Sequence, residues 1–321
     1  MKQLELKDFL DYNYLANLKT NDAQTHFAYI KSKADTTKNN YSHTLYISDG
    51  MTHNKAVDIN TAQFYWETDT SILVPHTTND DEKKKAQNTQ TVLYRYNLNN
   101  KTFEYADTLY VSASSIECIS DKTWLLTTSL QKEAHTIYED PANRNDTLAK
   151  ESDYEHFEEI TSISFYNDGG TFSRRNLGQA LIYNPLNKTY TRIFDKDMNV
   201  SLIRYDKETS RAYFVGKKDT GVKRLYNDTF IYDFNSSTLS TTFENETLAI
   251  SDYFELNGNQ YLLANDMKAM GLNTNDDFYI LKDKKATLTL EFGLSTGNST
   301  GSDARLLGGT SRHIIDNKFY F

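Results

Sequence analysis

Cysteine, proline and long apolar runs are all scarce in this chain of 321 residues. A single cysteine, Cys118, excludes an internal disulfide framework and any metal cluster built from cysteines. No apolar run approaches the roughly 18 residues that a membrane-spanning helix needs, and residues 1–6 lack the apolar core of a signal peptide. These absences predict a cytoplasmic protein in a reducing compartment, with no membrane partner.

Basic clusters are also missing, because the formal net charge is -9 at pH 7. Binding to nucleic acid depends on clustered Lys and Arg side chains that release counterions from the phosphates. The charge balance therefore predicts that nucleic acid is not a partner.

Aromatic residues are what this chain has in abundance, with 23 Tyr and 17 Phe against only 3 Pro. Tyr, Phe and Thr favour strands, and Asn favours turns, whereas the Ala and Leu that build helices are few. The composition predicts an all-β chain.

A repeat organises the sequence. Short segments rich in β-branched and aromatic residues recur around six tyrosines: Tyr46, Tyr94, Tyr138, Tyr183, Tyr232 and Tyr279. Successive members of this series are 48, 44, 45, 49 and 47 residues apart. A polar turn and another strand follow several of them, as in residues 97–103 and 183–190, which is typical of a β-hairpin.

A second series of strands precedes the tyrosine series, at residues 27–30, 71–74, 124–127, 212–215 and 260–263. Further strands come before these, as at residues 201–204 and 252–255. Four short antiparallel strands in a period of about 47 residues are typical of a β-propeller blade. The repeat therefore predicts a single propeller domain over residues 1–321.

Six complete periods predict at least six blades, and a seventh begins near Gly293. We therefore expect seven four-stranded antiparallel blades, of which the last is incomplete, preceded by a short helix or arm over residues 1–12. The chain stops at Phe321 in the second strand of that blade, which would leave a sheet edge unpaired. One interpretation is a shortened chain whose continuation supplies the last strands, and the alternative is that residues before Tyr14 close the ring.

Two connections exceed the usual loop length. Residues 77–89 are strongly charged and are predicted to form a solvated hairpin tip. Residues 139–155 form an acidic insertion between the third and fourth periods, and long loops of this kind often carry function.

No catalytic constellation is visible. Residues 293–297 match G-x-S-x-G, but the Asn, Ser, Thr and Gly that follow cannot start the helix that a nucleophile elbow requires. The seven histidines (His26, His43, His53, His76, His135, His156 and His313) lack the spacing of a zinc site, and no phosphate-binding loop is present. The sequence predicts no catalytic residue, no metal and no cofactor in this chain.

Three polar motifs allow a binding role. Residues 195–199 place oxygen ligands at alternate positions, but Val200 replaces the glycine of a calcium loop, so a hairpin turn is the simpler interpretation. Arg174 and Arg175 suit either a carboxylate ligand or a surface ion pair. Glu158 and Glu159 suit either the amino terminus of a bound peptide or a solvated strand end.

Three strings carry a family resemblance: residues 9–19, the acidic stretch 153–160 with residues 167–172, and residues 297–305. They resemble the N-terminal propeller of bacterial acylaminoacyl-peptidase-type members of the prolyl oligopeptidase family. The resemblance implies a propeller that caps a C-terminal α/β-hydrolase domain with a Ser-Asp-His triad and restricts entry to short peptides.

The sequence departs from that family in one respect, because the hydrolase half is absent and no triad residue can be assigned. The resemblance implies that the parent is a serine peptidase, while this chain alone is not an enzyme. It also implies that Glu158 and Glu159 hold the amino terminus of a substrate, as a glutamate pair does in the dipeptidyl-peptidase branch.

The resemblance therefore predicts a non-catalytic propeller that gates and orients short peptides for the hydrolase domain of the same polypeptide. Two alternatives remain open. One is a free-standing propeller that acts as a protein-interaction scaffold, and the other is a carbohydrate-active propeller with paired carboxylates near its axis.

Overall fold

The computed structural model describes residues 5–87, 89–131, 137–139, 142–144, 146, 148, 176–220, 226–268, 275–291, 293, 312–315 and 317–320. The chain divides into two compact units. The first comprises residues 1–129, 133–174 and 181–191, and the second comprises residues 130–132, 175–180 and 192–321.

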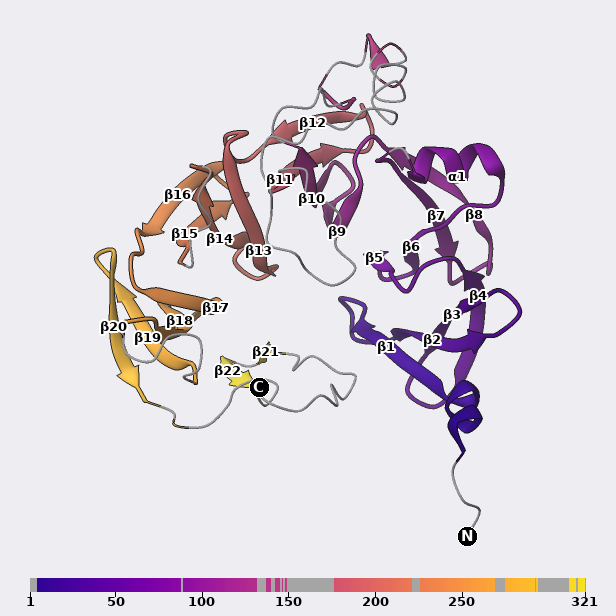
Figure 1. Ribbon diagram of the computed structural model, residues 1–321, viewed down its shortest axis with the longest axis horizontal. Helices are drawn as coiled ribbons and strands as arrows, with labels where there is room; N and C mark the ends of the chain where they lie inside the picture. Colours follow the sequence, from indigo (N-terminus) through magenta and orange to yellow (C-terminus); the bar gives the residue numbers. More distant parts are fainter. Residues whose placement is uncertain are drawn as a thin grey trace. The chain divides into compact units, whose positions relative to one another are not determined.

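Within the described residues, the strands form five four-stranded sheets and one two-stranded sheet (Figure 1). The first sheet contains β1 (Asn13–Thr20), β2 (Phe27–Asp35), β3 (Asn40–Ser48) and β4 (His53–Ile59), and the second contains β5 (Tyr65–Thr68), β6 (Ser71–Pro75), β7 (Thr91–Asn97) and β8 (Phe103–Leu109). The third contains β9 (Ala113–Ser120), β10 (Thr123–Gln131), β11 (Asn176–Asn184) and β12 (Thr189–Arg192).

The fourth sheet contains β13 (Met198–Asp206), β14 (Arg211–Lys218), β15 (Asp228–Asp233) and β16 (Thr238–Phe243). The fifth contains β17 (Leu248–Leu256), β18 (Asn259–Asp266), β19 (Asp277–Lys282) and β20 (Lys285–Leu290), and the two-stranded sheet contains β21 (His313–Ile315) and β22 (Lys318–Tyr320). In every four-stranded sheet the spatial order follows the chain order, and every strand pairing whose register is given is antiparallel.

These meanders confirm the all-β prediction and have the strand order of propeller blades. The predicted number of seven blades is not confirmed, because the described strands form six sheets.

The third predicted period was misplaced. The third strand of the third sheet is β11, which carries Tyr183, whereas Tyr138 lies in a turn within the connection from β10 to β11. The connection from β10 to β11 is about one period long and carries Tyr138 at the spacing of the tyrosine series. In the sequence alone, this insertion therefore counts as a repeat. The five strands of the second series all lie where the sequence places them, in β2, β6, β10, β14 and β18.

The same turn chemistry closes five hairpins. An Asp or Asn side chain at the end of one strand accepts backbone N–H groups two and three residues later, and the residue four positions later has a positive φ. The accepting residues are Asp35, Asn97, Asn184, Asp206 and Asp233, and the residues with positive φ are Asn39, Lys101, Lys188, Ser210 and Ser237. This Asx turn sets each hairpin without requiring glycine or proline.

A register shift recurs in the first strand of every four-stranded sheet. The extra residues are Asn17 with Leu18 in β1, Glu67 in β5, Ser114 in β9, Ile203 in β13 and Ser251 in β17. Fourth strands carry a second shift, at Ala56, Ala106, Thr242 and Thr289. Because a bulge increases the local twist of a strand, these paired shifts give the sheets a shared twisted shape.

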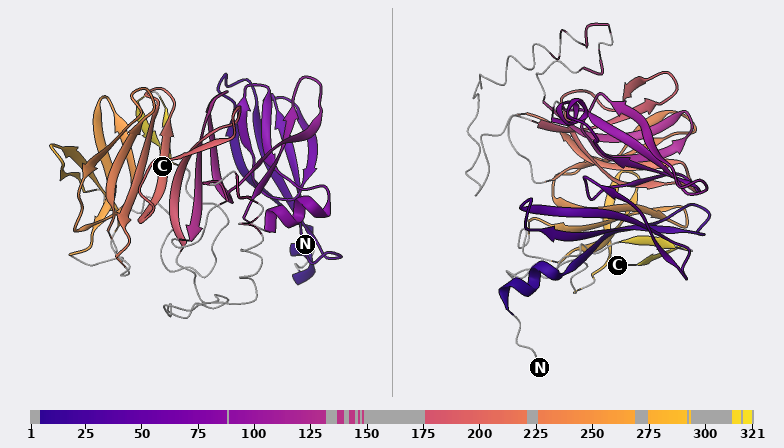
Figure 2. Two further views of the ribbon diagram at one scale, coloured as in Figure 1. Left: turned by 90° about the horizontal axis from the view of Figure 1, so that it is seen from above. Right: turned by 90° about the vertical axis from the view of Figure 1, so that its right-hand side faces the viewer.

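Two helices stand apart from the sheets. The 3-10 helix η1 (Leu6–Asp11) precedes β1. The connection from β6 to β7 contains the helix α1 (Asp80–Gln87), which corrects the prediction of a plain hairpin tip. Figure 2 shows both helices beyond the strand ends, on the same side of the first unit.

The helix α1 forms because its first turn is capped from both directions. Asn79 Oδ1 accepts the Glu82 N–H at 2.9 Å, and the Glu82 carboxylate accepts the Thr78 N–H at 2.7 Å. Tyr94 in β7 donates its hydroxyl to Glu82 at 3.0 Å, which attaches the cap to the sheet. This arrangement resembles a capping box with Asn79 at the N-cap, except that the glutamate accepts the N–H of the preceding residue, Thr78. The long charged run concealed this cap in the sequence.

Aromatic and aliphatic side chains fill the space between the first and second sheets, and likewise between the fourth and fifth sheets. Ala28, Ile30 and Leu45 of the first sheet pack with Ile72 and Val74 of the second. In the second unit, the fourth and fifth sheets share a cluster that contains Tyr213, Ile231, Tyr253, Leu262 and Tyr279. Tyr183, Tyr213 and Tyr253 are among the largest fully buried side chains, so tyrosine supplies much of the core.

The close contact between Gly216 of β14 and strand β13 can be tested by substitution. A methyl group at Gly216 would lie 2.6 Å from Val200 Cγ1 and 2.7 Å from the Asn199 carbonyl oxygen of β13. We expect Gly216→Ala to lower the free energy of unfolding by about 1–3 kcal/mol, because the packed strand cannot move aside. Urea denaturation measures this loss. The exposed Ser240→Ala in β16 is the control and should change stability by less than about 0.5 kcal/mol; equal effects of the two variants would contradict the packing.

Buried tyrosine also predicts sensitivity to alkali. Burial, together with nearby Glu117 and Cys118, raises the pKa of Tyr65 to about 12. An unfolded tyrosine titrates near pH 10, so between about pH 10 and 12 the unfolded state loses this proton while the folded state keeps it. Stability should therefore fall as pH rises through this range, by about 2–3 kcal/mol for this residue.

The matched variant is Tyr65→Phe. Urea midpoints measured from pH 8 to 12 should fall less steeply for Tyr65→Phe than for the unmodified chain. Parallel curves would show that Tyr65 ionises equally easily in both states.

Candidate functional site

The two residues that the sequence predicts as substrate contacts, Glu158 and Glu159, lie outside the described residues. The same holds for Arg174 and Arg175, for residues 294–297 of the G-x-S-x-G match, and for His135 and His156. The roles assigned to them stay predictions. The structure does describe how the insertion that carries the glutamate pair begins, at residues 137–148 with gaps.

Aromatic rings attach the beginning of this insertion to the first unit. Tyr138 packs against Tyr190 of β12 with ring centroids 5.4 Å apart, and the Tyr190 hydroxyl accepts the Tyr110 N–H at 2.9 Å. The Arg144 guanidinium lies 3.5 Å from the centre of the Tyr110 ring, and its Nε donates to the Ile137 carbonyl at 3.1 Å. A cation over a tyrosine face at this distance is a stabilising contact. We call Tyr110, Tyr138, Arg144 and Tyr190 the aromatic clamp.

A buried carboxylate lies next to the aromatic clamp. Asp107 at the end of β8 accepts the Tyr183 hydroxyl at 2.6 Å and forms an ion pair of 2.6 Å with Lys188. Its other oxygen accepts the Thr108 N–H at 2.7 Å. Burial, and then the Asp107 carboxylate, raise the pKa of Tyr183 well above its usual value. Tyr183 therefore stays a neutral donor, and the fully partnered Asp107 joins β8 to the β11–β12 hairpin.

A second polar cluster lies at the first strands of the fourth and fifth sheets. Arg204 follows the bulge of β13, and its Nη2 donates to both oxygens of Asp252 in β17, at 3.3 and 3.1 Å. Asp252 also accepts the N–H of Tyr253 at 2.8 Å. The Asp252 side chain is 6 % exposed and that of Arg204 is 17 % exposed, so the ion pair is mostly removed from water.

Arg312, which precedes β21, extends this cluster. Its Nη1 donates to the Ser251 carbonyl and hydroxyl, both at 3.1 Å, and its Nη2 lies 3.7 Å from Asp276. Two arginines therefore face two aspartates, Asp252 and Asp276, and the charges balance. Breaking such a buried pair is costly, but a balanced cluster has no surplus charge to bind an ionic ligand. We interpret it as a link between first strands.

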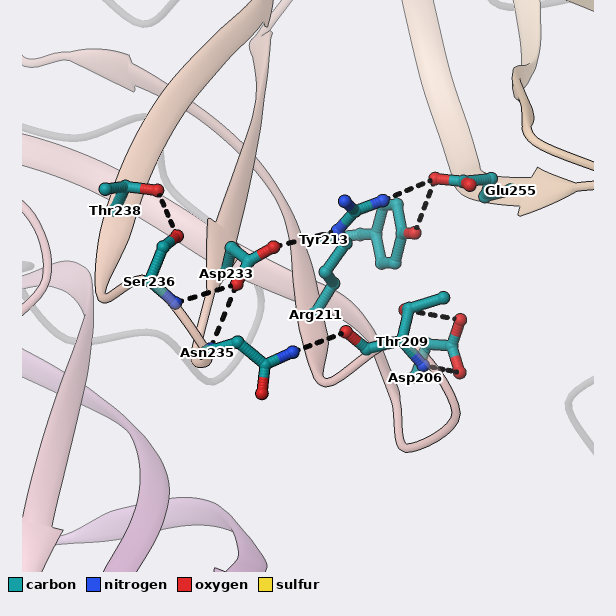
Figure 3. A network of polar contacts seen from close by, with 9 residues as sticks. All are labelled: Asp206, Thr209, Arg211, Tyr213, Asp233, Asn235, Ser236, Thr238 and Glu255. Atoms are coloured by element: carbon teal, nitrogen blue, oxygen red, sulfur yellow. Dashed lines mark hydrogen bonds and ion pairs between the residues drawn. The ribbon is translucent and has the colours of Figure 1, made fainter.

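A third polar cluster, shown in Figure 3, lies in the second unit. Arg211 of β14 contacts Asp233 of β15 at 3.1 Å and Glu255 of β17 at 3.2 Å. Tyr213 donates its hydroxyl to the same Glu255 oxygen at 3.2 Å. Asp233 also forms the Asx turn that ends β15, and the N–H of Ser236, followed by Arg211, holds its pKa below the usual value. One carboxylate thus stabilises a hairpin and orients an arginine toward the next sheet.

Two of the described histidines, His43 and His76, are partly buried. Burial lowers the pKa of both His43 and His76, which favours their neutral forms near neutral pH. The His43 Nδ1 lies 2.7 Å from the Ser32 hydroxyl, a pairing that resembles a nucleophile and its base. Ser32 is only 7 % exposed and lies on the packed face of β2, so a substrate carbonyl has no access to it.

The structure also describes the positions of residues 195–199 and of Cys118. Residues 195–197 lie in the connection from β12 to β13, between two sheets rather than within a hairpin, and residues 198 and 199 begin β13. The Met198 N–H donates to the Asp195 carbonyl at 3.0 Å. Cys118 lies in β9 and is partly buried.

Over the described part of the chain, no group of three or more His, Cys, Asp or Glu side chains is arranged to hold a metal ion. The described residues also contain no helix that is long and apolar enough to span a membrane.

Sequence reasoning missed Asp107, Arg204, Arg211 and Arg144, which organise these clusters. Asp233 and Asp206 carried a signal, because an Asp or Asn recurs at the end of strands within the repeat. Arg204 and Arg211 carried none, because each contacts a carboxylate of a distant strand, 48 residues away for Arg204 and 44 residues away for the Glu255 contact of Arg211.

Neither protein-family models nor curated proteins yield a match to this sequence. Similarity appears only among solved structures. An acylaminoacyl peptidase from Pyrococcus horikoshii superposes with a TM-score of 0.57 and 14% identity, covering 88% of this chain and 40% of that one. A structure from a study of two prolyl endopeptidases gives a TM-score of 0.50 and 9% identity, covering 90% of this chain and 35% of that one.

The β-propeller domain of the Trilobed protease from Pyrococcus furiosus is also similar, with a TM-score of 0.44 and 14% identity over 88% of this chain and 85% of that one. At such identities the similarity shows the fold alone. The chain spans less than half the length of the acylaminoacyl peptidase and of the prolyl endopeptidase. At the level of fold, the resemblance to propellers of prolyl oligopeptidase-type proteins is confirmed.

The aromatic clamp allows a direct test. Arg144→Ala removes both the contact with the Tyr110 ring and the hydrogen bond to Ile137, so residues 137–139 should open more often. We expect amide hydrogen exchange in residues 137–139 to rise about tenfold, which corresponds to about 1.4 kcal/mol and lies within the range of such contacts.

The exposed Lys122→Ala, in the turn from β9 to β10, serves as the control and should leave this exchange unchanged. Unchanged exchange in Arg144→Ala would show that Tyr138 alone holds the segment.

Proposed function

We propose that this chain is the non-catalytic propeller of a serine peptidase of the acylaminoacyl or prolyl oligopeptidase type. In this role it restricts access to the hydrolase domain of the same polypeptide and orients short peptides for cleavage. The observation that carries the proposal is the fold similarity to an acylaminoacyl peptidase over 88% of this chain but only 40% of that protein. A match to part of a larger peptidase is what a domain of such an enzyme would give.

The charged groups that are buried in the described residues contribute to the stability of the domain. The charged side chains that are mostly buried, such as Asp107, Arg204 and Asp252, are paired within or between sheets. Ser32, which contacts His43, is buried on the packed face of β2. A domain whose polar groups are used for its own stability can act by steric exclusion and by positioning. Folded proteins would be excluded by size, whereas flexible peptides would pass.

The size of the natural gene product is the first test. An antiserum against this chain should detect a band at about twice its 37.0 kDa in an extract of the source cell. A band near 37 kDa would contradict the peptidase role and favour a free-standing scaffold.

Activity of the complete gene product is the second arm of the test. The complete gene product should hydrolyse short N-acylated peptides. It should leave intact a folded protein that contains a sequence similar to those peptides. Residues 1–321 alone should hydrolyse neither substrate. The matched control is the complete product with its hydrolase serine replaced by alanine, which should lose activity but keep its unfolding midpoint. Cleavage of folded proteins at a similar rate would contradict the gating role.

A further inference from the structure

The turn between β17 and β18 differs in chemistry from the five Asx turns. It consists of Asn257 and Gly258, and the register pairs Leu256 with Asn259 on either side of it. Both turn residues have a positive φ, 49° for Asn257 and 72° for Gly258, which is typical of the type I′ turn that Asn-Gly favours. The sequence contains this Asn-Gly pair once.

The Asn257 side chain lacks the contacts that hold the asparagines of the Asx turns. The side-chain oxygens of Asn97 and Asn184 each accept backbone N–H groups two and three residues later. Among the described residues, neither the Asn257 side chain nor the Gly258 N–H has a hydrogen-bond partner, and the Asn257 backbone carbonyl accepts Asn259 Nδ2 at 3.3 Å. Both turn residues are exposed within the second unit, and a methyl group at Gly258 would meet no atom within 4 Å. The side-chain amide is therefore free to rotate toward the following backbone nitrogen.

An asparagine that precedes a glycine can react with its own backbone. The Gly258 nitrogen bonds to Asn257 Cγ, the Cγ–Nδ2 bond breaks, and the proton of that N–H leaves with the amide nitrogen as ammonia. The product is a five-membered succinimide ring. Water then opens the ring at either carbonyl and leaves aspartate or isoaspartate at position 257. Glycine allows the attack because it has no side chain to shield its nitrogen.

The turn lies beside a polar link between the fourth and fifth sheets. Glu255, two residues before Asn257, accepts Arg211 Nη1 and the Tyr213 hydroxyl, both at 3.2 Å (Figure 3). On the other side of the turn, Gln260 pairs with Glu255 and accepts the Tyr253 hydroxyl at 2.9 Å. Tyr213 is completely buried, as is Tyr253. The two-residue turn therefore sets the register that brings two acceptors to two buried tyrosines.

We propose that Asn257 is a site of spontaneous deamidation, and that its conversion loosens the Glu255 link between β14 and β17. Isoaspartate adds one carbon atom to the backbone of a two-residue turn, so Leu256 and Asn259 can no longer pair in the same register. Either product also adds a negative charge two residues from Glu255, whose side chain is only 17 % exposed. Like charges at this separation repel each other and weaken the hold of Glu255 on its partners.

Other turn residues lack one of the conditions for this reaction. Asp49 also precedes a glycine, but its Oδ1 accepts the N–H groups of Thr52 and Met51 at 2.8 and 2.9 Å. These hydrogen bonds lower the pKa of Asp49 to about 2, and an ionised carboxylate resists attack by a nitrogen. Asn100 and Asn187 precede lysines, and each side chain accepts the N–H two residues later at 3.2 Å. Asn257 is thus set apart by both its neighbour and its freedom.

Peptide mapping of the complete gene product tests the modification site. The product is kept at pH 8 and 37 °C, and the replacement of NH₂ by OH at each asparagine is followed by mass spectrometry. We expect Asn257 to convert at least tenfold faster than Asn100 or Asn187, and enzymatic methylation should detect isoaspartate in its peptide. Asn257→Gln is the matched control, because its extra methylene disfavours ring closure, and position 257 should then stay unconverted.

Hydrogen exchange tests the effect on the link. Converted chains carry an extra negative charge, so anion exchange separates them from unconverted ones. We expect amide exchange of residues 211–213 in β14 to rise about fivefold on conversion, although these residues lie outside the modified hairpin. In Glu255→Ala, which lacks the link from the start, exchange of residues 211–213 should be raised before conversion and should not rise further.

Each part of the proposal can fail separately. Conversion of Asn257 no faster than that of Asn100 or Asn187 would overturn the modification site. Conversion that leaves the exchange of residues 211–213 unchanged would overturn the loosened link. An equal rise on conversion in Glu255→Ala and in the unmodified chain would also overturn it, because the effect would then not pass through Glu255. None of these results depends on whether the product cleaves peptides.

Discussion

The stacking of one sheet on the next is the constraint on which the rest of this structure depends. Each four-stranded meander has two faces that bear apolar or aromatic side chains, and only neighbouring sheets can remove both faces from water. Tyr213 and Tyr253 illustrate the result, since they are completely buried between the fourth and fifth sheets. Because Tyr is long and polar at its tip, each of these hydroxyls also needs a partner, and Glu255 and Thr242 accept them.

The polar networks follow from that stacking. Buried carboxylates have charged partners from other parts of the fold: Lys188 in the β11–β12 turn contacts Asp107, and Arg204 of β13 contacts Asp252 of β17. These links add directional contacts to an otherwise non-directional apolar core.

Much of the fold could be predicted from local chemistry because the repeated unit is short. Strand composition, alternation and Asx turns each act within about ten residues, so β2, β6, β14 and β18 were predictable. Tyr138 shows the limit, because an insertion placed an aromatic residue at the expected interval without making a strand. The helix α1 shows another, since its cap depends on Tyr94 from a neighbouring strand. The binding roles predicted for Glu158 and Glu159 also remain predictions, because a binding role depends on the side chains that surround these residues in the folded protein.

The all-β class, the four-strand period and the places where the chain turns can all be predicted from the amino-acid sequence, because those properties arise from the conformational preferences of neighbouring residues. The assignment of each strand to a sheet, the pairing of the buried carboxylates and the position of the aromatic rings on the first sheet became known from the folded structure. Those features depend on contacts between residues tens of positions apart, such as Tyr183 with Asp107, which no local pattern encodes.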